Sequence, residues 1–142
     1  MSEKIEINDV SDTSLWVAHY RAKESERPDA IFQDPLAKIL VGERGKKIAE
    51  KMKAIGHYTE WSVISRTVII DDFILKLIQE GVDTVINLGT GLDTRPYRMN
   101  LPGSLRWIEV DFPQIIKHKS ALLKSEQPKC ELLRFELDLA DD

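Results

Sequence analysis

The chain has 142 residues, which is the length of a single domain. Its hydrophobic content of 42% is sufficient for a core, and its net charge of −4 without a basic stripe argues against nucleic acid as the main partner. A single cysteine, Cys130, excludes an internal disulfide, and no apolar run approaches the ~20 residues of a membrane span. The polar, acidic N-terminus is unlike a signal peptide, so we expect a cytoplasmic protein with no membrane partner.

The first 80 residues carry helix signals. Helices are predicted over residues 13–25, 35–41, 44–55 and 59–80. Asp34 followed by Pro35 is a strong start signal, because aspartate caps a helix and proline fits its first turn. Gly42 and Gly56 are expected to end the helices that precede them, because glycine readily adopts the backbone conformation found just past a helix.

Arg66 lies within the apolar last helix of this region. An arginine buried without a partner is costly, so we expect its guanidinium to meet a carboxylate. Asp71, Asp72 and the carboxylate of a ligand are the three candidates.

Four ring-bearing side chains of the same region could line a substrate pocket. They are His19, Tyr20, Tyr58 and Trp61. Packing in the core is the alternative role for each of them.

From residue 81 the pattern changes to alternating strands and helices. Strands are predicted over residues 84–88, 105–110 and 131–137, a short helix over 94–99 and a longer one over 113–124. This alternation implies parallel strands joined by right-handed crossovers. We therefore expect an N-terminal helical cap, residues 1–80, followed by the first half of a Rossmann-like α/β domain, residues 81–142.

A doubly wound nucleotide-binding sheet has about twice as many strands as this pattern provides. With the strand order 3-2-1, the strand over residues 84–88 lies at a bare edge. An unpaired apolar edge promotes association. We therefore expect a chain that is incomplete or that completes its sheet through another copy, as a homo-oligomer.

A glycine turn follows the first predicted strand. Gly89 and Gly91 allow the backbone to approach a ligand closely. Asp111 ends the second predicted strand, 22 residues after Gly89, where an acid accepts hydrogen bonds from a ribose in such folds. A dinucleotide fingerprint has a third glycine where this chain has Thr94, and this departure argues against a dehydrogenase.

S-adenosylmethionine places different demands on a site, because it has no pyrophosphate. It requires an apolar turn, an acid for the ribose, a polar group for the adenine amine and a cation for its carboxylate. Asp111, Asp138 and Arg66 could supply the last three in that order.

Four stretches of the chain also resemble a known family. They are residues 11–18 with 24–30 and 34–37; Arg66-Thr67 with Asp71-Asp72-Phe73-Ile74; Asn87-Leu88-Gly89-Thr90-Gly91-Leu92-Asp93-Thr94-Arg95 with Tyr97-Arg98; and Glu109-Val110-Asp111-Phe112-Pro113. Together they resemble the leucine carboxyl methyltransferase family, in its bacterial branch of S-adenosylmethionine-dependent O-methyltransferases.

The resemblance implies a class I methyltransferase that uses S-adenosyl-L-methionine to methylate an oxygen of a small molecule or carboxylate. It implies these cofactor contacts: Arg66 to the methionine carboxylate, Gly89 and Gly91 in the turn, Asp111 to the ribose, Asp138 with the Leu139 backbone to the adenine, and Arg21, or else Lys23, as a second cation for the carboxylate. It assigns no catalytic residue, and we expect no metal.

Alternatives remain for several of these residues and for the function. Asp138 could instead cap a helix, and Asp93 could pair with Arg95 to brace the turn. The alternative function is a non-catalytic cofactor-binding or interaction remnant that self-associates. A dehydrogenase ranks third, because of Thr94.

Overall fold

The computed structural model describes residues 10–140, without the side chains of residues 10, 11 and 53–56. The chain forms two compact units, Met1–Val68 and Ile69–Asp142. The division falls within a long helix, α3 (Lys53–Gln79), whereas the sequence places the boundary after residue 80. None of the helices in the described part is long and apolar enough to cross a membrane.

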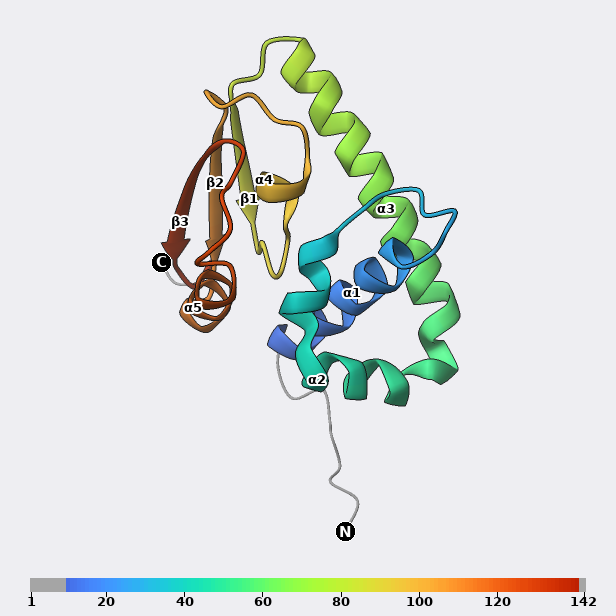
Figure 1. The fold of residues 1–142 in the computed structure, drawn as a ribbon. Coiled ribbons are helices and arrows are strands. Elements are labelled where there is room, and N and C mark those ends of the chain that lie inside the picture. The colour runs from blue at the N-terminus through green and yellow to red at the C-terminus, as the bar shows by residue number, and fades with distance from the viewer. Residues whose placement is uncertain (1–9, 141–142) are drawn as a thin grey trace. The chain divides into compact units, whose positions relative to one another are not determined.

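The first unit is helical. Helix α1 (Val10–Ser25) packs against α2 (Pro35–Lys51), and the first part of α3 belongs to the same unit (Figure 1). The buried apolar side chains of α1 and α2 include Trp16, Ala18, Leu40 and Ile48. The predicted start of α2 is confirmed, because Asp34 accepts a hydrogen bond from the backbone N–H of Ala37 and Pro35 occupies the first turn.

The helix boundaries of this unit correct two sequence predictions. Helix α1 begins three residues before residue 13, and Asp12 lies inside it, where its carboxylate accepts hydrogen bonds from Arg44. Gly42 interrupts α2 as predicted, with a non-helical backbone (φ 55°, ψ −168°). The stop predicted at Gly56 is wrong: α2 ends at Lys51, and α3 runs through position 56. A helix tolerates an interior glycine at a cost of about 1 kcal/mol, which packing can offset.

The second unit is built on a three-stranded parallel sheet. Strands β1 (Thr84–Leu88), β2 (Arg106–Asp111) and β3 (Glu131–Glu136) lie side by side in the order β1-β2-β3 (Figure 1). The short helix α4 (Arg95–Arg98) follows β1, and α5 (Pro113–Leu122) connects β2 to β3. The predicted alternation and parallel pairing are therefore confirmed, with boundaries that differ from the predicted ones by at most two residues.

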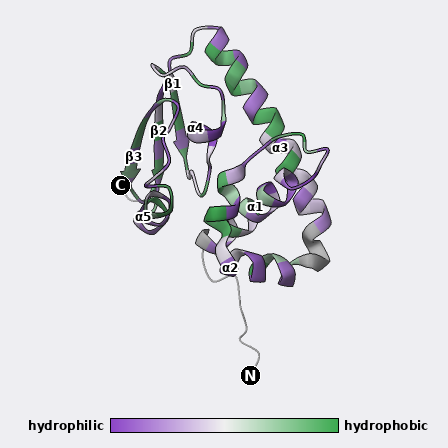
Figure 2. Cartoon of the chain, in the orientation of Figure 1, coloured by the Kyte–Doolittle hydropathy of each residue, from purple (hydrophilic) through white to green (hydrophobic). Residues whose placement is uncertain are grey.

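One face of this sheet is covered. Val85, Trp107 and Leu132 are neighbours across the strands, and Trp107 is almost fully buried. Around them pack apolar residues of the surrounding loops and of the last turns of α3, namely Met99, Leu101, Leu105, Cys130, Ile74, Leu75 and Ile78. Polar and apolar residues alternate along the coloured part of α3 (Figure 2).

The opposite face of the sheet is apolar but exposed. Because side chains alternate along a strand, Ile86 and Leu88 of β1 share this face with Leu133 and Phe135 of β3. Ile86 is 62% exposed and Phe135 is 52% exposed. Strand β1 also forms an edge of the sheet, in agreement with the predicted strand order.

Candidate functional site

The turn after β1 has the backbone shape that its glycines allow. Gly89 has φ 64° and Gly91 has φ 52°, and both values lie in the left-handed region that residues with a Cβ rarely adopt. A Cβ built on Gly89 would meet no atom within 4 Å. The glycine there is therefore required by the backbone conformation and leaves open space beside the turn.

The turn is bonded to the carboxyl end of the neighbouring strand β2. The N–H groups of Gly89 and Thr90 both point at the carbonyl oxygen of Val110, at 2.9 Å and 3.4 Å. The next N–H, that of Gly91, donates to Oδ2 of Asp111 at 2.6 Å. Three successive N–H groups of the turn thus fix it against the last two residues of β2.

Asp111 is the acid that the sequence predicts for the ribose. Its side chain is buried, and its Oδ1 accepts from the backbone N–H of Phe112 at 2.7 Å. Each carboxylate oxygen can accept a second hydrogen bond, so the carboxylate retains acceptor capacity. The structure therefore places Asp111 against the glycine turn with its orientation already set, at the carboxyl edge of a parallel sheet where ligands of such folds bind.

A row of polar residues crosses the covered face just below the turn. Asn87, Glu109 and Arg134 are direct neighbours on β1, β2 and β3. Glu109 is fully buried between two cations: it accepts from Lys119 of α5 at 2.7 Å and from Arg134 at 2.9 Å. This row ties the three strands and α5 together beneath the turn.

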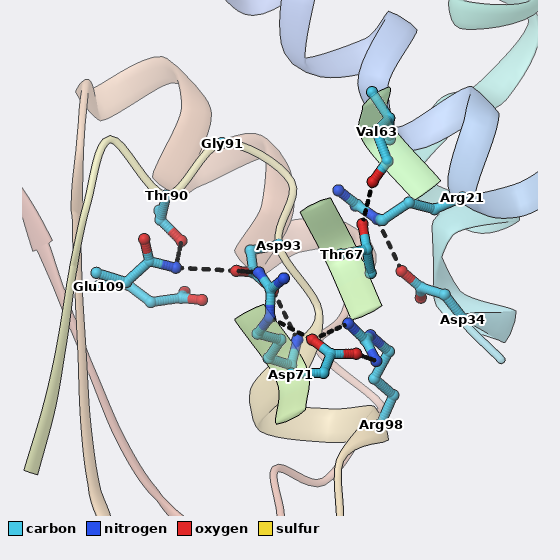
Figure 3. A network of polar contacts seen from close by, with 12 residues as sticks. Arg21, Asp34, Val63, Thr67, Asp71, Thr90, Gly91, Asp93, Arg98 and Glu109 are labelled. Carbon is cyan, nitrogen blue, oxygen red and sulfur yellow. Dashed lines mark hydrogen bonds and ion pairs between the residues drawn. The ribbon is translucent and has the colours of Figure 1, made fainter. Parts of the chain in front are cut away.

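A second polar network braces the turn from the side of α4. Asp93 accepts hydrogen bonds from Asn87 and from Arg95, which confirms the predicted pairing of Asp93 with Arg95. The carboxylate of Asp71 accepts from Arg95 at 2.7 Å and from two nitrogens of Arg98, at 2.6 Å and 2.9 Å (Figure 3). The last part of α3 is thereby held to α4.

The structure corrects the partners that the sequence predicts for Arg66. Asp71 is occupied by Arg95 and Arg98, and Asp72 is exposed. Arg66 itself is exposed, and the described residues provide no ion pair for it. The premise that Arg66 is buried was wrong, because its position in an apolar helix still faces outward. The carboxylate of a ligand remains a candidate partner for Arg66.

The other predicted cation, Arg21, is engaged within the first unit. Its Nε donates to Oδ2 of Asp34 at 2.9 Å, and both side chains are buried (Figure 3). The alternative, Lys23, forms an exposed ion pair with Glu60. Arg21 thus contributes to the link between α1 and the cap of α2.

Asp138 and Leu139 follow β3 at the same carboxyl edge of the sheet. Oδ1 of Asp138 accepts from the backbone N–H of Ala140 at 2.9 Å, which forms a local turn. The side chain of Leu139 is exposed. Asp138 therefore has a local structural partner in addition to the adenine role that the resemblance implies.

The first unit contains a pocket of about 280 Å³. It is lined by His19, Tyr20, Lys23, Ala49, Glu50, His57 and Glu60. Burial and the charge of Lys23 lower the pKa of His19, which favours its neutral form. Of the four proposed pocket residues, Tyr58 and Trp61 line neither this pocket nor the core, since they are 86% and 71% exposed.

Lys119 and Arg134 are polar residues of the site region that the sequence did not single out. Lys119 is fully buried, and burial lowers its pKa while the nearby Glu109 opposes that shift. The local sequence in α5 is typical of a surface lysine, because the residues before and after Lys119 are polar. Glu109 could have predicted such a residue, because an acid inside an apolar strand requires a cationic partner elsewhere in the fold.

Comparison with known proteins identifies the family. The chain matches the family model described as leucine carboxyl methyltransferase over residues 14–142. A protein of Streptomyces coelicolor is 32% identical over 99% of this chain and 53% of its own length. A protein of Mycobacteroides abscessus is 32% identical over 94% of this chain and 48% of its own, and one of Parafrankia sp. is 34% identical over 94% and 46%. All three bear the name "Putative S-adenosyl-L-methionine-dependent methyltransferase".

The chain spans about half the length of the curated relatives it matches. The family match nevertheless includes all three strands, the glycine turn and Asp111. Together with the parallel sheet and its crossover helix, it establishes the Rossmann-like α/β class that the sequence predicts. The chain belongs to the leucine carboxyl methyltransferase family.

Proposed function

We propose that this chain binds S-adenosyl-L-methionine at the turn after β1 and carries the cofactor half of a methyltransferase. The observation that carries the proposal is the Asp111 carboxylate, which the Gly91 N–H holds against a glycine turn with open space beside Gly89. The names of the relatives support the same cofactor.

The residues present fit this cofactor. Asp111 would accept hydrogen bonds from the two ribose hydroxyls, and the backbone at Gly89 and Gly91 would lie against the ligand. Asp138 and the Leu139 backbone would bind the adenine amine. The bound cofactor would supply a methyl group on a sulfonium, which is already a good leaving group.

The resemblance also implies two cationic contacts to the methionine carboxylate of the cofactor. Arg66 would pair with the methionine carboxylate, and its exposed guanidinium is available for such a partner. Arg21 would be a second cation, although its Nε already donates to Asp34. The protein would act mainly by positioning the reactants, because an in-line displacement requires alignment more than covalent help.

We further propose that the methyl acceptor is a small molecule methylated on oxygen, a hydroxyl or a carboxylate. The resemblance to O-methyltransferases supports this class of acceptor. Transfer of labelled methyl from S-adenosyl-L-methionine to a panel of small hydroxyl compounds and carboxylates tests it, and transfer to neither kind of oxygen would contradict it. The single cysteine supports a cytoplasmic setting.

Calorimetry tests the cofactor assignment. S-adenosylhomocysteine should bind and NAD should not, because Thr94 stands where the dinucleotide fingerprint has its third glycine. Binding of NAD without a response to S-adenosylhomocysteine would overturn the proposal.

Replacement of Asp111 tests the ribose contact. Asp111→Ala should weaken S-adenosylhomocysteine binding by about 1–3 kcal/mol, the scale for losing a charged hydrogen-bonding partner. The matched control is Glu131→Ala, an exposed acid at the opposite end of the sheet, which should leave the affinity unchanged. Equal affinities for all three proteins would show that the ribose is held elsewhere.

The exposed sheet face favours a second function, that of an interaction module that self-associates. We propose that a second copy covers this face, because an identical copy offers an apolar, pleated surface of the same dimensions, and two sheets stack readily face to face. Ile86, Leu88, Leu133 and Phe135 would form the contact. Light scattering at increasing concentration distinguishes a monomer from such a dimer.

A further inference from the structure

The side chain of Thr90 lies at the centre of a buried polar cluster. Its Oγ1 accepts a hydrogen bond from Nζ of Lys119 at 3.3 Å and one from Nδ2 of Asn87 at 3.2 Å (Figure 3 shows Thr90 beside Glu109). Thr90 is 6% exposed, and Lys119 is fully buried. The hydroxyl therefore connects the turn to α5 and to β1 at once.

Lys119 is an expensive residue to bury, because an ammonium loses its hydration in the interior. It lies among three charged groups from other elements: Glu109 of β2 at 2.7 Å, Arg134 of β3, and Asp93 of the turn. An apolar side chain of similar volume often stabilises a fold as well as a buried ion pair does. Beyond its ion pair with Glu109, Lys119 also donates a hydrogen bond to Thr90.

The backbone N–H of Thr90 makes a longer hydrogen bond than that of Gly89, while the Thr90 carbonyl accepts from the Asp93 N–H at 3.1 Å. The Thr90 N–H reaches the Val110 carbonyl at 3.4 Å, whereas the Gly89 N–H reaches the same oxygen at 2.9 Å. A long hydrogen bond is a weak restraint. The next peptide N–H, that of Gly91, contacts Asp111. The position of Thr90 thus bears directly on the contact between the turn and this acid.

We infer that the Thr90 hydroxyl tethers the turn to the buried Lys119–Glu109 pair, which makes Thr90 and Lys119 positioning residues for the cofactor. The tether holds the Gly91 N–H on Asp111 in the absence of ligand and so reduces the ordering that binding requires. The part of this inference that concerns the cofactor rests on the proposed function, whereas the tether itself does not.

Thr90→Val tests the tether, because valine keeps the volume of threonine and removes the hydroxyl. We expect the Gly91 amide to exchange its hydrogen about 2- to 10-fold faster than in the parent chain without ligand, the range for loss of one hydrogen bond. The affinity for S-adenosylhomocysteine should fall by a similar factor. The matched control, Thr90→Ser, keeps the hydroxyl and should restore both values to within about twofold.

A double-mutant cycle separates positioning from general stability. Lys119→Met should accelerate Gly91 exchange by a smaller factor in the Thr90→Val background than in the parent chain, because the two side chains share one contact, whereas loss of the Lys119–Glu109 pair acts equally in both backgrounds. Unchanged Gly91 exchange in Thr90→Val, or a Thr90→Ser chain that behaves like it, would overturn the inference. Should the parent chain fail to bind S-adenosylhomocysteine, the proposed function falls, and the exchange rates still decide whether the tether exists.

Discussion

Loss of Asp71 should strongly destabilise the second unit. The Asp71 carboxylate accepts hydrogen bonds from Arg95 and from two nitrogens of Arg98, all within 2.9 Å. Its side chain is 12% exposed, and those of the arginines are 13% and 7% exposed. Asp71→Ala removes one charged partner from each of the two guanidiniums, and Arg95 keeps its pair with Asp93. Removing one partner of a buried ion pair costs about 3–5 kcal/mol.

That cost is a large fraction of the 5–15 kcal/mol that typically stabilises a domain. Urea unfolding followed by circular dichroism should therefore show a transition at clearly lower denaturant concentration for Asp71→Ala. Asp72→Ala is the matched control, because Asp72 is the exposed neighbour and should change the free energy of unfolding by less than about 0.5 kcal/mol. If the two variants unfold together, the network does not stabilise the unit and the reasoning from its geometry is refuted.

Two further predictions concern the pH dependence of stability and the exposed sheet face. Burial raises the pKa of Cys130 from 9.0 to about 11, so the stability that the protonated thiol contributes is present below pH 9 and is lost as the pH rises through 11. Urea melts should show that the free energy of unfolding of the parent chain, relative to that of Cys130→Ala, falls by about 1–3 kcal/mol between these pH values. A difference between the two chains that does not change with pH would contradict this. Phe135→Lys should abolish a concentration-dependent increase in mass measured by light scattering, whereas Gln127→Lys on an exposed connector should not. Equal behaviour of the two variants would exclude the sheet face as the contact.

The local structure around the turn could be predicted from the sequence. Strand β1 has the bounds that the run of β-branched residues predicts, and Gly89 and Gly91 have the positive φ values expected of a turn. The position of Asp111 against this turn followed from the parallel order of the strands, because the carboxyl ends of neighbouring parallel strands meet at one edge. These features depend on short-range pattern and on a general rule of chain topology.

The helix ends were predicted less well. Gly56 was expected to end a helix, but α3 passes through it and the break lies at Met52. A glycine weakens a helix by only about 1 kcal/mol, so contacts made elsewhere along the helix decide whether it continues. The sequence near a glycine does not contain those contacts.

The partners of the charged residues were decided by the tertiary structure. The sequence favoured Arg66 as a buried arginine near Asp71, yet Asp71 binds Arg95 and Arg98, which are more than 20 residues further along the chain. Lys119, in a polar stretch of α5, is fully buried against Glu109 and Thr90.

The sequence by itself determined the strands, the glycine turn, the acid that follows it and the family. The tertiary structure decided which charges meet and which apolar side chains remain exposed on the sheet. The physical reason is that strand and turn preferences act over a few neighbouring residues. The partner of a buried charge is chosen by geometry between distant segments, where desolvation penalises any charge left unpaired.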